Sequence, residues 1–584
     1  MLLTLCLCQD QTMQHRMLGG GYTNMDSEYD QGYGMEPGSM MMANMPDQVA
    51  NFLRDFQDWI HRDVYVQNNQ GGYEPDAQLR QEKLNEIQTC YEYKFSKFSE
   101  VFYNNQAWPH ADLVSQLVDG DDVFLMLYKE LYFRHLYAKL GQNITIEQRI
   151  ESWENYTSLF DRIFSDDDDD NNLDRLDLPV QWLWDMVDEF VYQFTDFCRF
   201  RSKDLKKRSV AEIEIMAQKP KIWDSMQVMS TLNRMVAASE IIAILKEDKQ
   251  NPEEAKLHTQ LTSEIGIAHV QLVLGYYALV SMCRMHCSSG DYYTALKCIE
   301  NLDFSTASDR VPFYMRVTSC YIALYYYMGF SLMMSRRYTD AVRTMTGVLM
   351  YLYRTQHLTR PYQYEQLNKR SEQMYKLIAM CINLCPQRNV EDIVLQHLQD
   401  KYSDQLGRLA KGEEAMFDEI FNYAAPKFFY PGHPNYADAS NPVTFKDISQ
   451  TIGQQLAVFK MDKQQQQKLP LIRSYLKLYT TISTTKLASF AEGMPEEQLR
   501  AHILALKHKS TGLVRSAKAG SSPLDGEVVS SSVFDFYLDK SVILISDSRS
   551  QPTFVHFFTK HISKLEGLVN DLKVSRPDSF HERL

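Results

Sequence analysis

The stretch IRSYLKLY, at residues 472–479, begins the part of the chain that decides its fold. From here to residue 546 the sequence predicts three short helices and then two β-strands, at residues 472–479, 485–490, 496–509, 533–538 and 541–546. Only Asp539 and Lys540 separate the two β-runs, which predicts a tight turn and therefore a hairpin. Three helices followed by a hairpin are typical of a winged helix.

The composition is that of a large, well-packed protein. With 584 residues, the chain is long enough for about two to four domains. Apolar residues make up 44% and aromatic residues 12%, which excludes global disorder. Only 24 glycines are present, which disfavours an all-β or dinucleotide-binding fold. The net charge of −14 argues against a protein whose main task is to hold nucleic acid.

The first part of the chain, residues 1–46, predicts a disordered tail. It is rich in Gln, Gly and Met and shows neither helical nor strand periodicity. Its apolar start, Met1–Cys8, is too short for the core of a signal peptide and has no basic residues before it. The most apolar run of the chain, Leu272–Cys283, contains two tyrosines and a serine and is shorter than the roughly 18 apolar residues of a membrane span.

Residues 47–265 carry helical patterns. The run at 123–137 is apolar on most faces, which predicts a largely buried helix. Five consecutive aspartates, Asp166–Asp170, lack the alternating ligands, the glycine and the distal glutamate of a calcium loop, so they predict a solvated loop. Pro179 stands just before another apolar run at 181–191, where a proline suits the first turn of a helix.

Residues 266–425 contain a repeat. Gly290–Ala295 fits the Gly-x-Tyr-x-x-Ala core of a tetratricopeptide-like helix pair, and Arg336–Ala341 fits the same positions with Arg336 in place of the glycine. Gly329 stands where such a repeat has its small packing residue. Helix pairs that cannot bury their apolar faces alone stack on their neighbours. The sequence therefore predicts a mainly α fold, with a helical-repeat α-solenoid capped by the winged helix.

Two segments flank the predicted winged helix at 471–548. Residues 426–470 are expected to form an irregular connection: the first part is rich in Pro, and the Gln-rich part that follows predicts a polar helix end or a linker. Residues 554–572 predict a C-terminal helix with apolar residues spaced four, three, four and three apart. Because so short a helix is marginal alone, its apolar seam should pack on this chain or on partner helices. The seam consists of Phe558, Ile562, Leu565, Val569 and Leu572.

The sequence contains no motif of a known catalytic site. A phosphate-binding Gly-rich loop, a His-Glu-x-x-His pair, a nucleophile elbow and the kinase motifs are all absent. The cysteines have no disulfide-framework spacing, and Cys283, Cys287, Cys381 and Cys385 lie on probable helices among apolar residues. They predict buried thiols, with a metal site near His286 as the alternative. We therefore expect neither a cofactor nor an enzyme.

Two classes of function remain. A scaffold would assemble through the hairpin, whose apolar residues are expected on both faces and at an unpaired edge. These candidate partner-binding residues are Val533, Phe534, Phe536, Val542 and Ile543. A nucleic-acid binder would use the basic residues of 471–520, where eight Lys and Arg stand against three Glu, a local charge of +5. The candidates for weak contact with the RNA backbone are Arg500, Lys507, Lys509, Arg515 and Lys518. A merely solvated face explains the same charges.

Four strings carry a resemblance to a known family. They are FLMLYKELYFRH at 124–135, QWLWD at 181–185, MMSRRYTDA at 333–341 and SYLKLYTT at 474–481. These strings resemble the subunit L family of eukaryotic translation initiation factor 3. The resemblance runs from about residue 47 to residue 572 and departs from the family in the tail and at Asp166–Asp170.

The resemblance implies a PCI domain, in which helical repeats are capped by a winged helix. It also implies a non-catalytic scaffold subunit in the octameric PCI/MPN core of the initiation factor, beside subunits K and E, in the cytoplasm. The complex would bind the small ribosomal subunit and support preinitiation-complex assembly and mRNA recruitment. The alternatives are a PCI subunit of a proteasome lid or signalosome, and a winged-helix nucleic-acid-binding protein.

Overall fold

The computed structural model describes most of the chain. The described residues are 45–67, 73–141, 143–165, 175–202, 209–251, 256–304, 311–355, 361–384, 390–432, 448–491, 493–515, 522–530, 534–547, 558–559 and 561–569. Nearly all of the predicted tail 1–46, together with Asp166–Asp170, Val533, Lys518 and Leu572, lies outside them. Backbone contacts divide the chain into Met1–Asp47 and Gln48–Leu584, and the elements below belong to the second unit apart from the first residue of α2.

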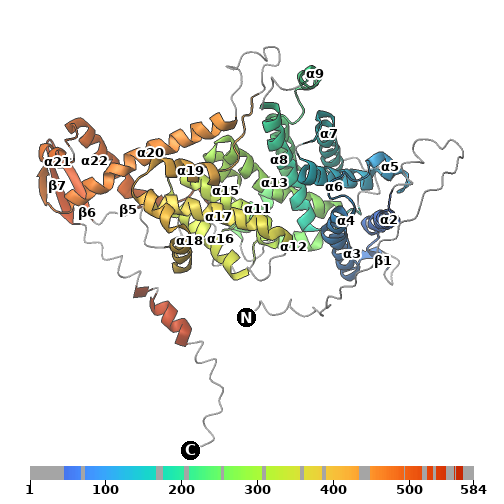
Figure 1. Cartoon of the computed structure of the whole chain (residues 1–584). Helices are drawn as coiled ribbons and strands as arrows, with labels where there is room; N and C mark the ends of the chain where they lie inside the picture. Colours follow the sequence, from blue (N-terminus) through green and yellow to red (C-terminus); the bar gives the residue numbers. More distant parts are fainter. Residues whose placement is uncertain are drawn as a thin grey trace, which may run out of the picture. The chain divides into compact units, whose positions relative to one another are not determined.

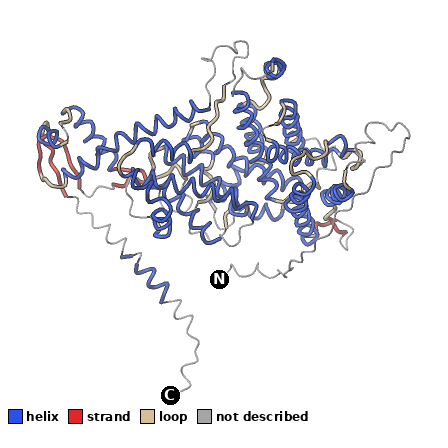
Figure 2. The backbone as a smooth tube through the Cα atoms, viewed as in Figure 1, coloured by secondary structure: helices blue, strands red, loops and turns tan. Residues whose placement is uncertain are grey.

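Helices make up most of the described backbone, so the prediction of a mainly α fold is confirmed (Figure 2). The first part of the chain contains α2 (Asp47–His61), α3 (Ala77–Thr89), the π-helix η1 (Cys90–Lys94), α4 (Phe95–Phe102), α5 (Ala111–Ser115), α6 (Asp122–Leu140), α7 (Ile146–Ile163), α8 (Val180–Ser202), α9 (Val210–Gln218), α10 (Ser225–Ala238), α11 (Ile241–Gln250) and α12 (Lys256–Ser263).

Local sequence explains where several of these helices begin. Thr145 and Gln148 form a capping box at the start of α7, with each side chain bonding the other residue's main-chain N–H. The Asp121 carboxylate accepts from the Phe124 N–H and so caps α6. Pro179 precedes α8 as predicted, and its carbonyl accepts from the Leu183 N–H. The predicted apolar helix at 123–137 is α6, and most of its large apolar side chains are buried.

The middle of the chain is a series of helices in which each packs on the next (Figure 1). They are α13 (Ile267–Ser289), α14 (Tyr292–Cys298), the 3₁₀-helix η3 (Phe313–Arg316), α15 (Thr318–Met334), α16 (Tyr338–Thr355), α17 (Pro361–Leu384), α18 (Asp392–Ala410) and α19 (Glu414–Ala424).

The two sequence repeats have the same geometry. Gly290 ends α13 with a φ of 89°, and Arg336 follows α15 with a φ of 62°, so Arg336 adopts the left-handed conformation that glycine favours. Ala295 and Ala341 are both fully buried. At Gly329 a Cβ atom would lie 2.7 Å from Met345 Cγ, which shows how closely α15 approaches α16.

The second half of 426–470 is a helix and not an irregular connection, which agrees with the alternative of a polar helix for the Gln-rich part but extends it. Residues 448–470 belong to a long helix, α20 (Ile448–Leu476), with Pro470 inside it. The Gln, Lys, Leu and Met residues of this segment are strong helix formers. Pro470 removes one main-chain hydrogen bond, but Leu469, Ile472 and Leu476 around it are buried in the core of the C-terminal module. Their burial outweighs that loss.

The C-terminal module combines the end of α20 with two helices and a sheet. They are α21 (Thr484–Phe490), α22 (Glu496–Ser510), β3 (Thr481–Ser483), β6 (Phe534–Asp539) and β7 (Val542–Asp547). The sheet is antiparallel with the order β3-β7-β6. Lys540 forms the β6–β7 turn with a positive φ of 53°. The central strand is therefore β7, and β6 is an outer strand.

Two small ribbons had no counterpart in the sequence prediction. One pairs β1 (Tyr65–Gln67) with β2 (Tyr73–Pro75), and the other pairs β4 (Thr511–Val514) with β5 (Glu527–Ser530). Each strand has only three or four residues, which is too few for a clear alternating pattern.

Candidate assembly surfaces

The hairpin buries one face in its own module. Phe536 of β6 and Ile543 of β7 are 4% and 0% exposed and pack on the apolar residues of α20, α21 and α22. The prediction that these two side chains contact a partner is therefore wrong, because strand alternation turns them toward the helices. Tyr537 and Val542 point the other way and are exposed. The side chain of Phe534 lies outside the described residues.

The outer edge of β6 is guarded by a lysine from α22. The Ile545 N–H donates to the Thr480 carbonyl, on the side of β7 that faces away from β6. Ile545 and its pair partner Phe536 are therefore a non-hydrogen-bonded pair, and the N–H and carbonyl of Phe536 point away from β7. Lys507 Nζ donates to the Phe536 carbonyl at 2.7 Å and to Asp535 Oδ1 at 2.6 Å. The Asp535 carboxylate in turn accepts from the Phe536 N–H. A lysine and a carboxylate therefore occupy the groups that a further strand would use.

The four predicted RNA-contacting side chains that the structure describes are engaged within the chain. Arg500 Nη2 lies 2.7 Å from Glu496 Oε1, one turn earlier on α22. Burial lowers the pKa of Arg515, whose guanidinium lies over the Phe304 ring. Lys507 and Lys509 also have carboxylate partners, Asp535 and Asp462. Contact with RNA at these positions stays a prediction, and it would have to replace these partners.

Two buried carboxylates connect the C-terminal module to the helical repeats. Asp462 of α20 accepts from Lys509 Nζ at 3.0 Å and from the Tyr338 hydroxyl of α16, and it pairs with Arg336 at 3.3 Å. Asp340 of α16 accepts from the Arg515 N–H at 3.1 Å. Residues of the repeat motif itself therefore contact α20 and the residue that follows β4, while Lys509 of α22 joins the same junction through Asp462.

Arg337 completes this junction. Its guanidinium pairs with Asp340 at 2.6 Å and donates to the main-chain carbonyls of Pro523, Leu524 and Asp525, in the turn before β5. A guanidinium can serve several acceptors at once because its donors form a fixed, planar fork. The β4–β5 ribbon is thereby held on α16.

The C-terminal seam is exposed in this chain. Residues 558–559 and 561–569 are helical, and Phe558, Ile562, Leu565 and Val569 are 47–60% exposed. Their spacing places them on one face of the helix. Leu568 on a neighbouring face is equally exposed, which the spacing did not predict.

The described residues hold no group of three or more His, Cys, Asp or Glu side chains placed to bind a metal. Cys283 and Cys287 are fully buried, and burial raises the pKa of both thiols. In the same part of the chain, no single helix has the length and apolar composition of a membrane span. The helices α10 and α11 reach that composition only together, across a 53° bend.

Known proteins match the chain over nearly its whole length. The family model described as RNA polymerase I-associated factor PAF67 matches residues 148–565. A protein of Nematostella vectensis named eukaryotic translation initiation factor 3 subunit L is 38% identical over 558 residues, which cover 95% of this chain and 98% of that relative. Proteins of the same name from Xenopus tropicalis and Homo sapiens are each 39% identical over 557 residues, 94% of both chains in each case.

This chain belongs to the subunit L family of eukaryotic translation initiation factor 3. It therefore has the role of an initiation factor subunit, and such a subunit works within a multisubunit complex. The prediction of the family from the four strings is confirmed.

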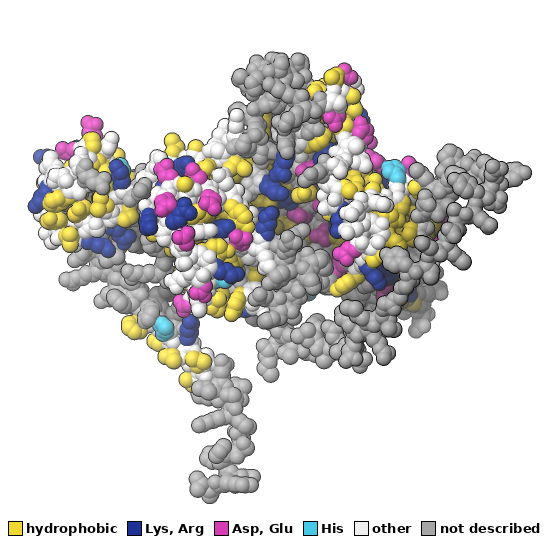
Figure 3. All heavy atoms as spheres, viewed as in Figure 1, with side chains coloured by type: hydrophobic (Ala, Val, Ile, Leu, Met, Phe, Trp, Pro, Cys, Tyr) yellow, Lys and Arg dark blue, Asp and Glu magenta, His cyan; other side chains and the backbone are white. Residues whose placement is uncertain are grey.

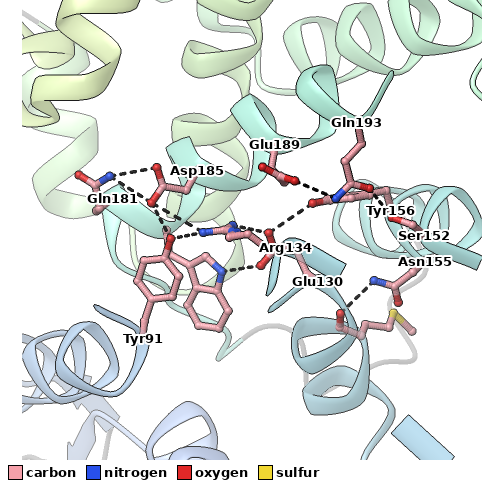
Figure 4. Close-up of polar contacts among 12 residues, drawn as sticks. Tyr91, Glu130, Arg134, Ser152, Asn155, Tyr156, Gln181, Asp185, Glu189 and Gln193 are labelled. Carbon is pink, nitrogen blue, oxygen red and sulfur yellow. Dashed lines mark hydrogen bonds and ion pairs between the residues drawn. The ribbon is translucent and has the colours of Figure 1, made fainter. Parts of the chain in front are cut away.

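Two of the strings that resemble the subunit L family build a buried polar network (Figure 4). Glu130 of α6 is fully buried, pairs with Arg134, and accepts from Trp182 Nε1 at 3.0 Å and from the Tyr156 hydroxyl at 3.3 Å. Asp185 of α8 accepts from the Tyr91 hydroxyl at 2.5 Å. The network joins η1, α6, α7 and α8.

Glu189 extends this network along α8. Burial raises its pKa to about 7, although Arg134 opposes the shift and Gln193 donates a hydrogen bond at 3.0 Å. A raised carboxyl pKa is also found in general acids, yet here the neighbouring polar groups are engaged with one another. In this member of the subunit L family, the network provides hydrogen-bond partners for polar side chains that are buried between the helices.

Proposed function

We propose that the chain is a non-catalytic scaffold subunit of eukaryotic translation initiation factor 3 that works in the cytoplasm. The observation that carries the scaffold role is the exposed apolar seam of the C-terminal helix, on a chain related to subunit L over nearly its whole length. A seam of this kind is costly in water and is stabilised by partner helices.

The architecture proposed is a PCI domain. The helices α13–α19 form the helical-repeat solenoid, and the end of α20 with α21, α22 and the β3-β7-β6 sheet forms the winged helix. Three features support this interpretation: the matching repeat geometry at Gly290 and Arg336, the stacking of successive helices, and the packing of the sheet on three helices.

Two surfaces are proposed for assembly. The outer edge of β6 pairs with a strand of a neighbouring PCI subunit, which displaces Lys507 and Asp535 from the Phe536 main chain. The C-terminal helix joins a bundle of helices from other subunits through Ile562, Leu565 and Val569. Subunits K and E are the expected neighbours, and the assembled complex would carry the chain to the small ribosomal subunit, where it supports preinitiation-complex assembly and mRNA recruitment.

The test is to purify the tagged chain from cells and quantify its companions by mass spectrometry. The proposal predicts the other subunits of the initiation factor in near-stoichiometric amounts, with K and E retained longest as salt is raised. Recovery of proteasome-lid or signalosome subunits instead would contradict it. Recovery of RNA with no companion subunit would favour the nucleic-acid-binding alternative.

A further inference from the structure

Basic side chains from four segments meet at the C-terminal half of α8. The segment after α19 crosses α8 and α13, because Arg201 donates to the Tyr430 and Pro431 carbonyls and the Phe429 N–H donates to the Ser288 carbonyl. This crossing brings together α8, α13, α17 and the segment itself. We call the five basic residues there the basic cluster: Arg199, Arg284, Lys369, Arg370 and Lys427. Figure 3 shows dark-blue side chains gathered near the middle of the drawn face, where Figure 1 labels α8 and α13.

The basic cluster is poorly neutralised within the chain. Among the described residues, the ion pair between a carboxylate and the basic cluster is the one that joins Asp188 to Arg284 at 2.5 Å. This ion pair neutralises one of the five positive charges of the cluster. The Lys427 side chain is exposed, but the protein around its ammonium group partly desolvates it. This desolvation first, and then the four other members of the cluster, lower its pKa to about 8. A chain with a net charge of −14 thus concentrates like charges at one place, which costs free energy unless an anion binds there.

Two members of the cluster are held in place. Arg284 is 13% exposed and is fixed by Asp188, whose main-chain carbonyl also accepts from its guanidinium. The guanidinium of Arg370 lies 4.6 Å from the centre of the Tyr326 ring and donates to Gln373 at 3.1 Å. Arg199, Lys369 and Lys427 are exposed at the surface. Fixed guanidinium groups beside exposed cations suit a ligand with several phosphates.

Exposed aromatic rings lie beside these cations. Tyr192 is 36% exposed, and Lys427 Nζ lies 5.6 Å from its ring centre. Tyr423 is 38% exposed, and Lys376 Nζ lies 3.7 Å from its ring centre, with Glu372 as the lysine's ion-pair partner. Proteins that bind single strands combine cations along the backbone with aromatic rings on which bases stack. The rings favour a nucleic acid over an acidic peptide, which needs only the cations.

We propose that the basic cluster binds the phosphate backbone of single-stranded RNA, with Tyr192 stacking on a base. The site lies on the helical part of the chain, away from the winged-helix residues first considered for RNA. It does not depend on how the C-terminal module assembles.

The test measures the anisotropy of a fluorescein-labelled 12-nucleotide oligouridylate titrated with the full chain at several KCl concentrations. The cluster variant is Arg199→Ala/Lys369→Ala/Lys427→Ala, which changes exposed side chains only. The matched control is Arg62→Ala/Lys219→Ala/Arg234→Ala, which removes the same charge from side chains that are 44%, 51% and 45% exposed.

The cluster variant should bind at least about tenfold more weakly and lower the slope of log affinity against log salt by about two. The control should stay within about twofold of the parent chain. Equal losses in both variants would overturn the proposal, as would a cluster variant that binds like the parent.

A second readout separates RNA from an acidic peptide. Tyr192→Ala should weaken binding of the oligouridylate severalfold, whereas Tyr192→Phe should retain it, because the ring and not the hydroxyl stacks. Polyglutamate of equal charge should compete poorly. Equal competition by polyglutamate together with unchanged binding by Tyr192→Ala would assign the cluster to acidic peptides and overturn the RNA proposal.

Discussion

The ammonium group of Lys509 on α22 lies 3.0 Å from the Asp462 carboxylate on α20, which also accepts from the Tyr338 hydroxyl of the repeat motif. One buried carboxylate thus serves the helical repeats and the C-terminal module together. Replacing it should loosen the module without disturbing the helices on either side.

Asp462→Ala should destabilise the chain by about 3 kcal/mol, because it leaves Lys509 and Tyr338 without their buried partner. Differential scanning calorimetry should show an earlier unfolding transition, and proteolysis should release the C-terminal module sooner. The matched control is Asp418→Ala, which breaks a half-exposed pair with Lys460 and should cost under about 1 kcal/mol. Equal effects of the two variants would show that the junction is not fixed by Asp462.

Alanine substitutions of Gly329 and Gly347 should have opposite effects on the stability of the chain. Gly329→Ala places a Cβ 2.7 Å from Met345 Cγ and should destabilise the chain by about 1–3 kcal/mol, because α15 and α16 must move apart. Gly347→Ala, at an exposed position of α16, has no atom within 4 Å of its Cβ and should stabilise the chain by about 0.5–1 kcal/mol. Chemical unfolding measures both, and a neutral Gly329→Ala would contradict the close approach of the helices.

Glu189 should make the stability of the chain depend on pH. Its pKa rises from 4.5 to about 7 on folding, so the folded chain holds a proton that the unfolded chain has released between these values. The stability contributed by Glu189 is therefore greatest below about pH 4.5 and falls as the pH rises toward 7. Glu189→Gln should raise the free energy of unfolding at pH 8 by roughly 1–3 kcal/mol and leave it nearly unchanged at pH 4.5. An equal change at both pH values would indicate a packing effect instead.

The edge of β6 can be tested without breaking the sheet. Leu538 lies two residues after Phe536, so its N–H also faces away from β7. Leu538→Pro removes that donor from a partner strand, and proline is tolerated on an edge strand. The variant should lose neighbouring PCI subunits in co-purification, while Leu538→Ala, which removes a similar amount of packing, should keep them. Full retention by the proline variant would exclude strand pairing at this edge.

Much of the fold was readable from the sequence. The buried helix α6, the start of α8 after Pro179 and the repeats at Gly290 and Arg336 follow from apolar periodicity and from small residues at fixed spacing. The predicted β-runs 533–538 and 541–546 overlap the observed strands β6 and β7 with an offset of one residue. Local patterns are strong where one face of an element is buried.

The rest depends on contacts between distant residues. Whether Phe536 faces a partner or its own helices is decided by the order β3-β7-β6, and the three-residue strand β3 leaves no pattern in the sequence. The sequence predicted a boundary at residue 470, but Pro470 lies inside α20, where burial of the residues around it keeps the helix continuous. The basic cluster draws on residues 199, 284, 369, 370 and 427, which no window of sequence brings together.

The most direct test of the scaffold role changes one face of the C-terminal helix. Leu565→Asp places a charge in the apolar seam, and Ser563→Asp adds the same charge outside the seam. Both variants would be expressed with a tag in cells, and the companion subunits would be quantified by mass spectrometry beside the unfolding midpoint of each chain. We predict that Leu565→Asp loses most of its companions with an unchanged midpoint, whereas Ser563→Asp keeps them. Full incorporation of Leu565→Asp, or a loss that only follows a lowered midpoint, would contradict this prediction.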